Sequence, residues 1–143
     1  MARTKPMSTD FWVDALSVGV DEFDRAHREQ LNTIGEIEAA LGQGEGESAC
    51  ALLDRLLRHL VSHQAEEMEL LVRTDYPGID HIREVQTANL ARLERLREMV
   101  KAGTNLSDAR RIATEMRMAF VDYLLKGDIN FKSHLDMAGI AYR

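Results

Sequence analysis

The sequence predicts an all-α protein, an up-down-up-down four-helix bundle preceded by an N-terminal arm. Apolar residues recur every three or four positions along four long stretches, which is the spacing of one helix face. Short segments rich in glycine, proline and small polar residues separate these stretches, and no stretch has the alternating pattern of a strand. Four long helices with short connections favour an antiparallel bundle, a fold that builds its metal sites in the core.

The first two helices are bounded by clear turn signals. Residues 1–20 lack sustained helical spacing, so we expect them to form an arm that packs on the domain. A helix is expected over residues 21–41, and the glycines at positions 42, 44 and 46 end it. Ser48 is a plausible N-cap for a second helix over residues 48–73. Pro77 and Gly78 follow it, since proline lacks an amide hydrogen and glycine tolerates turn angles.

The second half of the chain predicts two further helices. One is expected over residues 79–101, closed by Gly103, and the other over residues 107–135. The bundle domain should therefore cover residues 21–138, followed by a short C-terminal tail over residues 139–143. A chain of 143 residues is long enough for one domain with its own core.

Composition excludes several classes of partner. The net charge of −6 argues against a nucleic-acid footprint, which is normally basic. No apolar run is long enough to cross a bilayer, so no membrane association is expected. The first residues lack the apolar core of a signal peptide, and the single cysteine, Cys50, cannot form an internal disulfide. These features predict a protein of the reducing cytoplasm.

The second predicted helix carries a pattern typical of metal ligands. His59, His63 and Glu67 follow one another at intervals of four residues, in a run that is otherwise rich in leucine. Residues four apart share a helix face, so His63 and Glu67 are expected to point into the core. A buried carboxylate needs a cation or a set of donors, and a metal ion satisfies this most simply. His59 either extends the site or lies at the polar edge of the bundle.

Three segments of the chain resemble the hemerythrin family, in the right order and over residues 12–136. The resemblance implies a pair of carboxylate-bridged non-haem irons in the bundle core that reversibly binds dioxygen. The segments that carry it are Asp24-x-x-His27, preceded by Trp12 and residues 17–20; His63-x-x-x-Glu67, followed by Tyr76-Pro77; and residues 123–132, which contain Asp128.

The resemblance also implies a set of ligands. His27 and His63 match the histidines that hold one iron, and Glu67 and Asp128 match the two bridging carboxylates. Three further histidines hold the second iron in the family. The corresponding positions here are Ile82, Gln86 and Tyr123.

Several residues are candidate replacements at the second iron. Gln86 could ligate through its amide oxygen, and Tyr123 either ligates as a phenolate or donates a hydrogen bond to Glu67 or a bound water. His81 lies one residue from the family register, but the apolar stripe of its helix passes through Ile82 and Gln86, which places His81 to one side. The number of irons, one or two, stays open, and imidazole and carboxylate also suit manganese or zinc.

The resemblance implies a binding protein rather than an enzyme. We expect a non-haem iron protein that binds dioxygen or a small anion for carriage, storage or sensing, with a separate protein partner if it is a sensor. The substitutions at the second iron leave two alternatives. One is a redox enzyme with a mononuclear or altered di-iron site that acts on peroxide or another oxidant. The other is a metal-poor interaction or sensor module.

Overall fold

Four helices account for most of the chain, and the described residues contain no strand. The computed structural model describes residues 16–17, 20–103, 105–137 and 139, and the side chains of residues 126–133, 135 and 136 lie outside that description. The helices are α1 (Asp21–Gly42), α2 (Gly46–Arg73), α3 (Ile79–Lys101) and α4 (Leu106–Met137). Most of the predicted arm and of the predicted tail falls outside the described residues.

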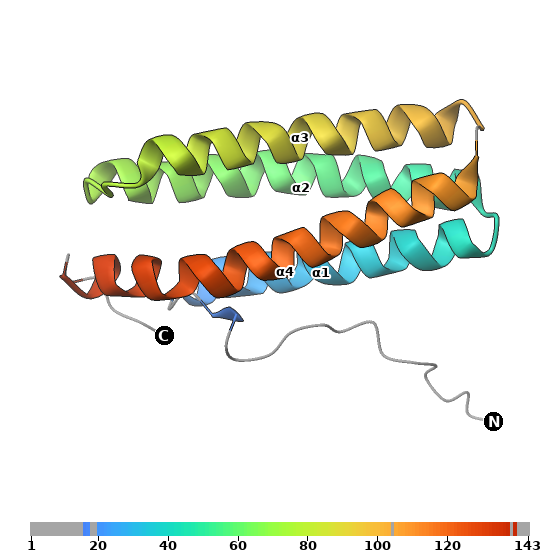
Figure 1. The fold of residues 1–143 in the computed structure, drawn as a ribbon. Coiled ribbons are helices and arrows are strands. Elements are labelled where there is room, and N and C mark those ends of the chain that lie inside the picture. The colour runs from blue at the N-terminus through green and yellow to red at the C-terminus, as the bar shows by residue number, and fades with distance from the viewer. Residues whose placement is uncertain (1–15, 18–19, 104, 138, 140–143) are drawn as a thin grey trace, which may run out of the picture.

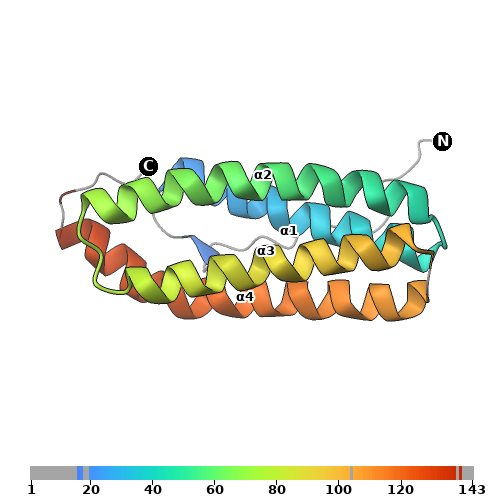
Figure 2. The same ribbon diagram turned by 90° about the horizontal axis from the view of Figure 1, so that it is seen from above.

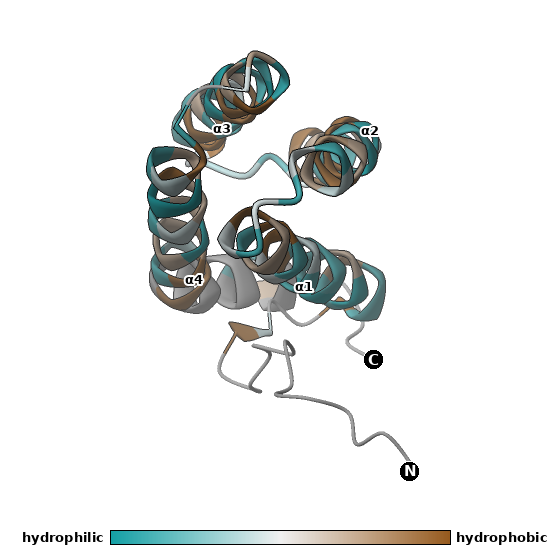
Figure 3. Ribbon diagram, turned by 90° about the vertical axis from the view of Figure 1, so that its right-hand side faces the viewer, coloured by the Kyte–Doolittle hydropathy of each residue, from teal (hydrophilic) through white to brown (hydrophobic). Residues whose placement is uncertain are grey.

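Consecutive helices run in opposite directions, which confirms the predicted up-down-up-down bundle (Figure 1). Their long axes lie roughly side by side (Figure 2). The neighbouring pairs are α1 with α2, α2 with α3, α3 with α4, and α4 with α1. Seen along the bundle, the four helices surround a common core (Figure 3). None of the described helices is both long and apolar enough to cross a membrane.

The helix ends follow local backbone chemistry. Gly103, the second residue after α3, has a φ of +70°, the left-handed conformation expected of a residue that closes a helix. The side chain of Asn105 caps α4, because its Oδ1 accepts hydrogen bonds from the backbone amides of Ser107 at 3.0 Å and Asp108 at 3.2 Å. The prediction that Ser48 opens the second helix is wrong: α2 begins at Gly46, and Ser48 lies in its first turn.

The apolar core consists of three clusters at different positions along the bundle axis. A large apolar cluster fills the half that contains the α1–α2 and α3–α4 connections, with residues from all four helices. Two smaller clusters lie in the other half, around Phe23 and Leu71 and around Leu31 and Leu124. Each large side chain buried in this way contributes roughly 1.5–3 kcal/mol. Among the side chains that the structure describes, the buried polar ones are His27, Gln30, Thr33, Glu38, His63, Gln64 and Glu67.

An ion pair between Glu38 and the partly exposed Arg117 connects α1 to α4. Glu38 is 8% exposed, and its Oε1 accepts a hydrogen bond from Arg117 Nε at 2.6 Å. Its Oε2 accepts from Arg117 Nη2 at 3.2 Å and from the hydroxyl of Thr114. A guanidinium that binds both carboxylate oxygens fixes direction as well as distance. This pair therefore sets how the two helices face one another.

Replacing Glu38 with alanine should lower the free energy of unfolding by about 2–3 kcal/mol, somewhat less than for a fully buried pair because Arg117 is partly exposed. Urea denaturation measures the change. Glu36→Ala is the matched control, since Glu36 forms an exposed pair with Arg55 at 3.4 Å, and its effect should stay within about 0.5 kcal/mol. Equal effects of the two substitutions would contradict this interpretation.

Candidate metal centre

Three potential metal ligands meet in the core between α1 and α2. His27 comes from α1, and His63 and Glu67 come from α2, with exposed fractions of 3%, 4% and 6%. The Nε2 atoms of the two histidines lie 3.0 Å apart, and Oε2 of Glu67 lies 3.6 Å from the first and 3.8 Å from the second. The three residues thus form a buried cluster able to hold a metal ion.

The spacing of these atoms suits one cation. Metal–ligand bonds of about 2.1 Å place neighbouring ligand atoms roughly 3.0 Å apart in an octahedral site and roughly 3.4 Å apart in a tetrahedral one. The observed separations of 3.0, 3.6 and 3.8 Å are close to these values. A metal ion could therefore bind with small adjustments of the side chains.

Aromatic rings pack against the imidazoles of His27 and His63. Phe23 packs edge-on against His63, with ring centroids 5.4 Å apart, and Phe120 from α4 packs edge-on against His27 at 5.7 Å. The imidazoles are themselves nearly perpendicular, at 82°. Such packing limits ring rotation and keeps water away from the cluster, so the ligand geometry is largely set by the fold.

Burial and neighbouring groups set the ionisation of the cluster. Burial, followed by the proximity of His27, lowers the pKa of His63 to about 4, although the charge of Glu67 opposes this shift. His63 is therefore neutral at pH 7, as a metal ligand must be. Burial disfavours the ionised form of Glu67, but the interactions with His27, whose Nε2 lies 3.6 Å from the carboxylate, and with His63 and Gln86 outweigh this and lower the pKa of its carboxyl.

Gln86 contacts the cluster from α3. Its Nε2 donates a hydrogen bond of 3.1 Å to Oε1 of Glu67, the oxygen that does not face the histidines. Ile82, one turn earlier, is buried, so the predicted inner stripe of α3 through Ile82 and Gln86 faces the core. Gln86 thus orients the carboxylate through its amide nitrogen, and this arrangement does not present its amide oxygen as a ligand.

The two other histidines considered as ligands lie outside the cluster. His81 is exposed at the start of α3. The ring of His59 is nearly parallel to that of His63, at 5°, with centroids 6.4 Å apart. Its Nε2 is buried without a hydrogen-bond partner among the described groups. His59 therefore lies beside the cluster, one turn away along α2.

Two further candidate ligands, Tyr123 and Asp128, lie on α4, and the structure describes the side chain of Tyr123 but not that of Asp128. Tyr123 packs against both of the smaller apolar clusters. Burial, followed by the charge of Glu67, raises the pKa of its phenol well above the ordinary value, so without a metal the hydroxyl keeps its proton. Asp128 lies on α4, but its side chain is outside the described part, and its role as a ligand stays a prediction.

Sequence reasoning missed two features near the cluster. Gln30 is 2% exposed, one turn after His27, and helical spacing alone could have placed it inside. His134, near the end of α4, binds Thr74 in the α2–α3 connection, with 2.8 Å between Nε2 and Oγ1, and packs against the ring of Tyr76. No local pattern predicts a contact between residues 60 positions apart.

The metal-free protein should lose stability as the pH falls from about 6.5 to about 4. In the unfolded chain His63 regains its ordinary pKa of 6.5, so the unfolded state binds this proton first. The loss should total roughly 3 kcal/mol, be absent above about pH 6.5 and level off below about pH 4. Glu67, whose pKa is lowered from 4.5, adds a further loss only in more acidic solution.

Urea denaturation at a series of pH values measures this dependence. In His63→Gln the slope between pH 6.5 and 4 should flatten, because the group that takes up the proton has been removed. A slope that is unchanged in the variant would show that another group is responsible.

Comparison with known proteins gives one informative relative. A bacteriohemerythrin of Stenotrophomonas maltophilia (strain R551-3) is 26% identical over 97 residues. The match covers 68% of this chain and 63% of the relative, which is less than two thirds of the relative's length. No family model matches the chain, and no solved structure matches it. The similarity to this relative supports a relationship to the hemerythrin-like family, and the four-helix bundle is consistent with the hemerythrin fold.

Proposed function

We propose that this chain binds one non-haem iron ion through His27, His63 and Glu67, with Asp128 as a fourth ligand. The convergence of three buried donors from α1 and α2 carries the proposal. The name of the bacteriohemerythrin relative supports iron as the metal. Two imidazoles and a carboxylate are also the donors of mononuclear non-haem iron sites, which keep positions open. Iron held there would supply open coordination positions for dioxygen or a small anion.

One metal ion, rather than two, is favoured by how Glu67 is used. A bridging carboxylate gives one oxygen to each metal, whereas Oε1 of Glu67 accepts a hydrogen bond from Gln86. The groups expected near a second metal are also poorly suited to it: His81 is exposed, and burial favours the protonated phenol of Tyr123. These observations support a site that keeps the ligands of one iron of the hemerythrin pair and lacks those of the other.

The function that fits this site is the binding of dioxygen for carriage, storage or sensing. A sensor would need a protein partner. The single-metal donor set also supports a second candidate, a redox enzyme acting on peroxide, because open positions beside one iron admit an oxidant. Repeated consumption of peroxide by the iron-loaded protein would favour the enzyme, and reversible dioxygen binding without loss of iron would favour the carrier.

Metal analysis after anaerobic reconstitution with ferrous iron should find about one iron per chain. His63→Ala should lose most of this iron, because the cluster would keep only one imidazole. Asp128→Ala should weaken binding if its carboxylate is the fourth ligand. His81→Ala is the matched control and should retain full metal content, since His81 is exposed outside the cluster.

Each departure from this result has a distinct meaning. Almost no iron in the wild-type protein would refute iron binding and favour the metal-poor module. About two irons per chain would refute the single-metal site but keep the family assignment. Full iron retention in His63→Ala would refute the ligand set.

The ferric protein should show no visible absorption from a tyrosine ligand, and Tyr123→Phe should leave its spectrum unchanged. The reason is that Tyr123 packs against the two smaller apolar clusters, where burial and the charge of Glu67 raise the pKa of its phenol in the metal-free protein. Visible absorption spectroscopy of the wild-type and variant ferric proteins tests this prediction. A visible band that disappears in Tyr123→Phe would show that the phenolate binds iron.

A further inference from the structure

His134, near the C-terminal end of α4, contacts two side chains of the α2–α3 connection. Its Nε2 lies 2.8 Å from Oγ1 of Thr74, and its ring packs edge-on against that of Tyr76, with centroids 4.9 Å apart. The hydroxyl of Thr74 donates its own hydrogen to the carbonyl oxygen of Leu70 at 2.9 Å, so it accepts the bond from His134. The imidazole of His134 therefore carries a proton on Nε2 and binds the end of α4 to the end of α2.

Tyr76 connects this contact with the surroundings of the metal centre. It packs against the apolar cluster that contains Phe23, and Tyr123 of α4 packs against the same cluster. Phe23 in turn lies edge-on against the ring of His63. The connection that His134 binds therefore lies at the same end of the bundle as the metal ligands.

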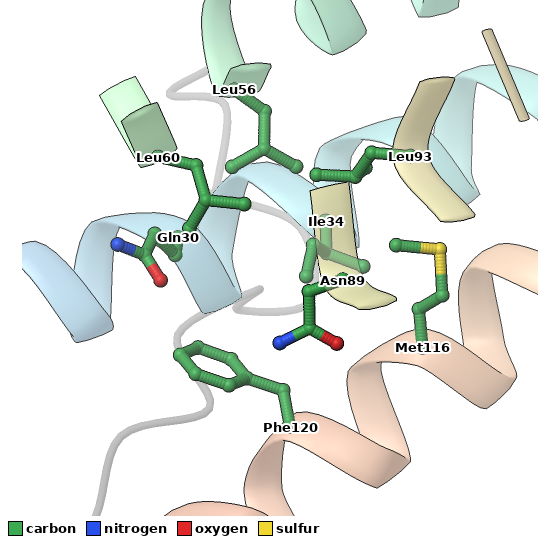
Figure 4. A pocket seen from close by; sticks show the side chains of 8 residues that line it. All are labelled: Gln30, Ile34, Leu56, Leu60, Asn89, Leu93, Met116 and Phe120. Carbon is green, nitrogen blue, oxygen red and sulfur yellow. The ribbon is translucent and has the colours of Figure 1, made fainter. Parts of the chain in front are cut away.

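The core-facing side of α4 leads directly to position 128. Met116, Phe120 and Leu124 follow one another at intervals of four residues and pack in the core. Figure 4 shows the first two extending from α4 toward side chains of the other three helices. Residues four apart share a helix face, so position 128, one turn after Leu124, continues this side of α4. Leu124 is 2% exposed, so packing fixes α4 one turn before position 128.

His134 provides a second fixed point, after position 128. It lies six residues further along α4, roughly 9 Å along the helix axis. Beyond Leu125 the structure describes the side chains of His134 and Met137, and Met137 is 89% exposed. The segment that carries Asp128 thus lies between Leu124, which is packed in the core, and His134, which is bonded to the α2–α3 connection.

We propose that His134 is a positioning residue of the metal centre, which holds the segment of α4 that carries Asp128 beside the metal cluster through its contacts with Thr74 and Tyr76. A ligand whose backbone is already held loses less conformational freedom when it binds a metal, so the contact raises metal affinity. The inference rests on the proposed iron site. His134 acts through the backbone of α4 and is not a ligand.

Hydrogen exchange of the metal-free protein tests the positioning, and ferrous iron affinity tests its consequence. In His134→Ala the backbone amides of residues 128–137 should exchange about fivefold faster than in the wild-type protein, the effect of losing one ordinary hydrogen bond. The same variant should bind ferrous iron about fivefold more weakly. Amides in the first turns of α4, which lie at the other end of the bundle, should exchange at the wild-type rate.

Two further variants separate the hydrogen bond from the bulk of the ring. Glutamine carries an amide nitrogen where the imidazole has Nε2, so His134→Gln can still donate to Thr74 and should restore most of both values. Thr74→Val removes the acceptor and should reproduce the effects of His134→Ala, and the double variant should be no worse than either single one. Met137→Ala is the matched control, because Met137 lies in the same last turn but is exposed.

The proposal would be overturned if His134→Ala exchanged at the wild-type rate, if faster exchange left the iron affinity unchanged, or if His134→Gln behaved like His134→Ala. Absence of iron from the wild-type protein would instead refute the iron site. Faster exchange in metal-free His134→Ala would then still support the hold of His134 on α4, so the two failures are distinguishable.

Discussion

The carboxylate of Glu67 is the constraint on which the polar layer of this bundle depends. It is a buried negative charge in a core made mostly of leucine, and such a charge persists only with partners. His27 from α1 and Gln86 from α3 provide them, so Glu67 joins three helices at one level of the bundle. Its charge also contributes to the raised pKa of both Tyr76 and Tyr123. One carboxylate thus contributes, after burial, to the pKa shifts of several groups around the site.

This polar layer is possible because stability comes largely from elsewhere. The large apolar cluster occupies the other half of the bundle, and the Glu38–Arg117 pair fixes α1 against α4 beside it. Metal-binding bundles generally place their ligands on facing helices of a core that is otherwise well packed. The division seen here places the buried histidines and Glu67 in one half of the bundle and the larger apolar core in the other.

Periodicity predicted the parts of the fold and site that depend on neighbours along one helix. Four helices, the shared face of His63 and Glu67, and the inward stripe through Ile82 and Gln86 all follow from a repeat of 3.6 residues. The resemblance to hemerythrins added His27, which the structure places in the same cluster.

Features that depend on partners far along the chain were not predictable in this way. The bond between Glu38 and Arg117 joins residues 79 positions apart, and the cap of α4 depends on the conformation of Asn105. Gln30 was overlooked for a different reason: a polar residue on an apolar stripe is easily assigned to the surface, although its spacing from His27 places it in the core.

The short distance between the two imidazoles has a consequence for how a metal would enter. With 3.0 Å between them, the Nε2 atoms share one hydrogen bond, so one of the two rings carries its proton on that nitrogen. A metal ion needs both Nε2 lone pairs, and the ring that donates must therefore change tautomer. Its proton would move to Nδ1, which is buried without a partner among the described groups in both rings. Metal binding thus exchanges a satisfied hydrogen bond for a buried Nδ1–H, a cost that offsets part of the free energy of metal binding.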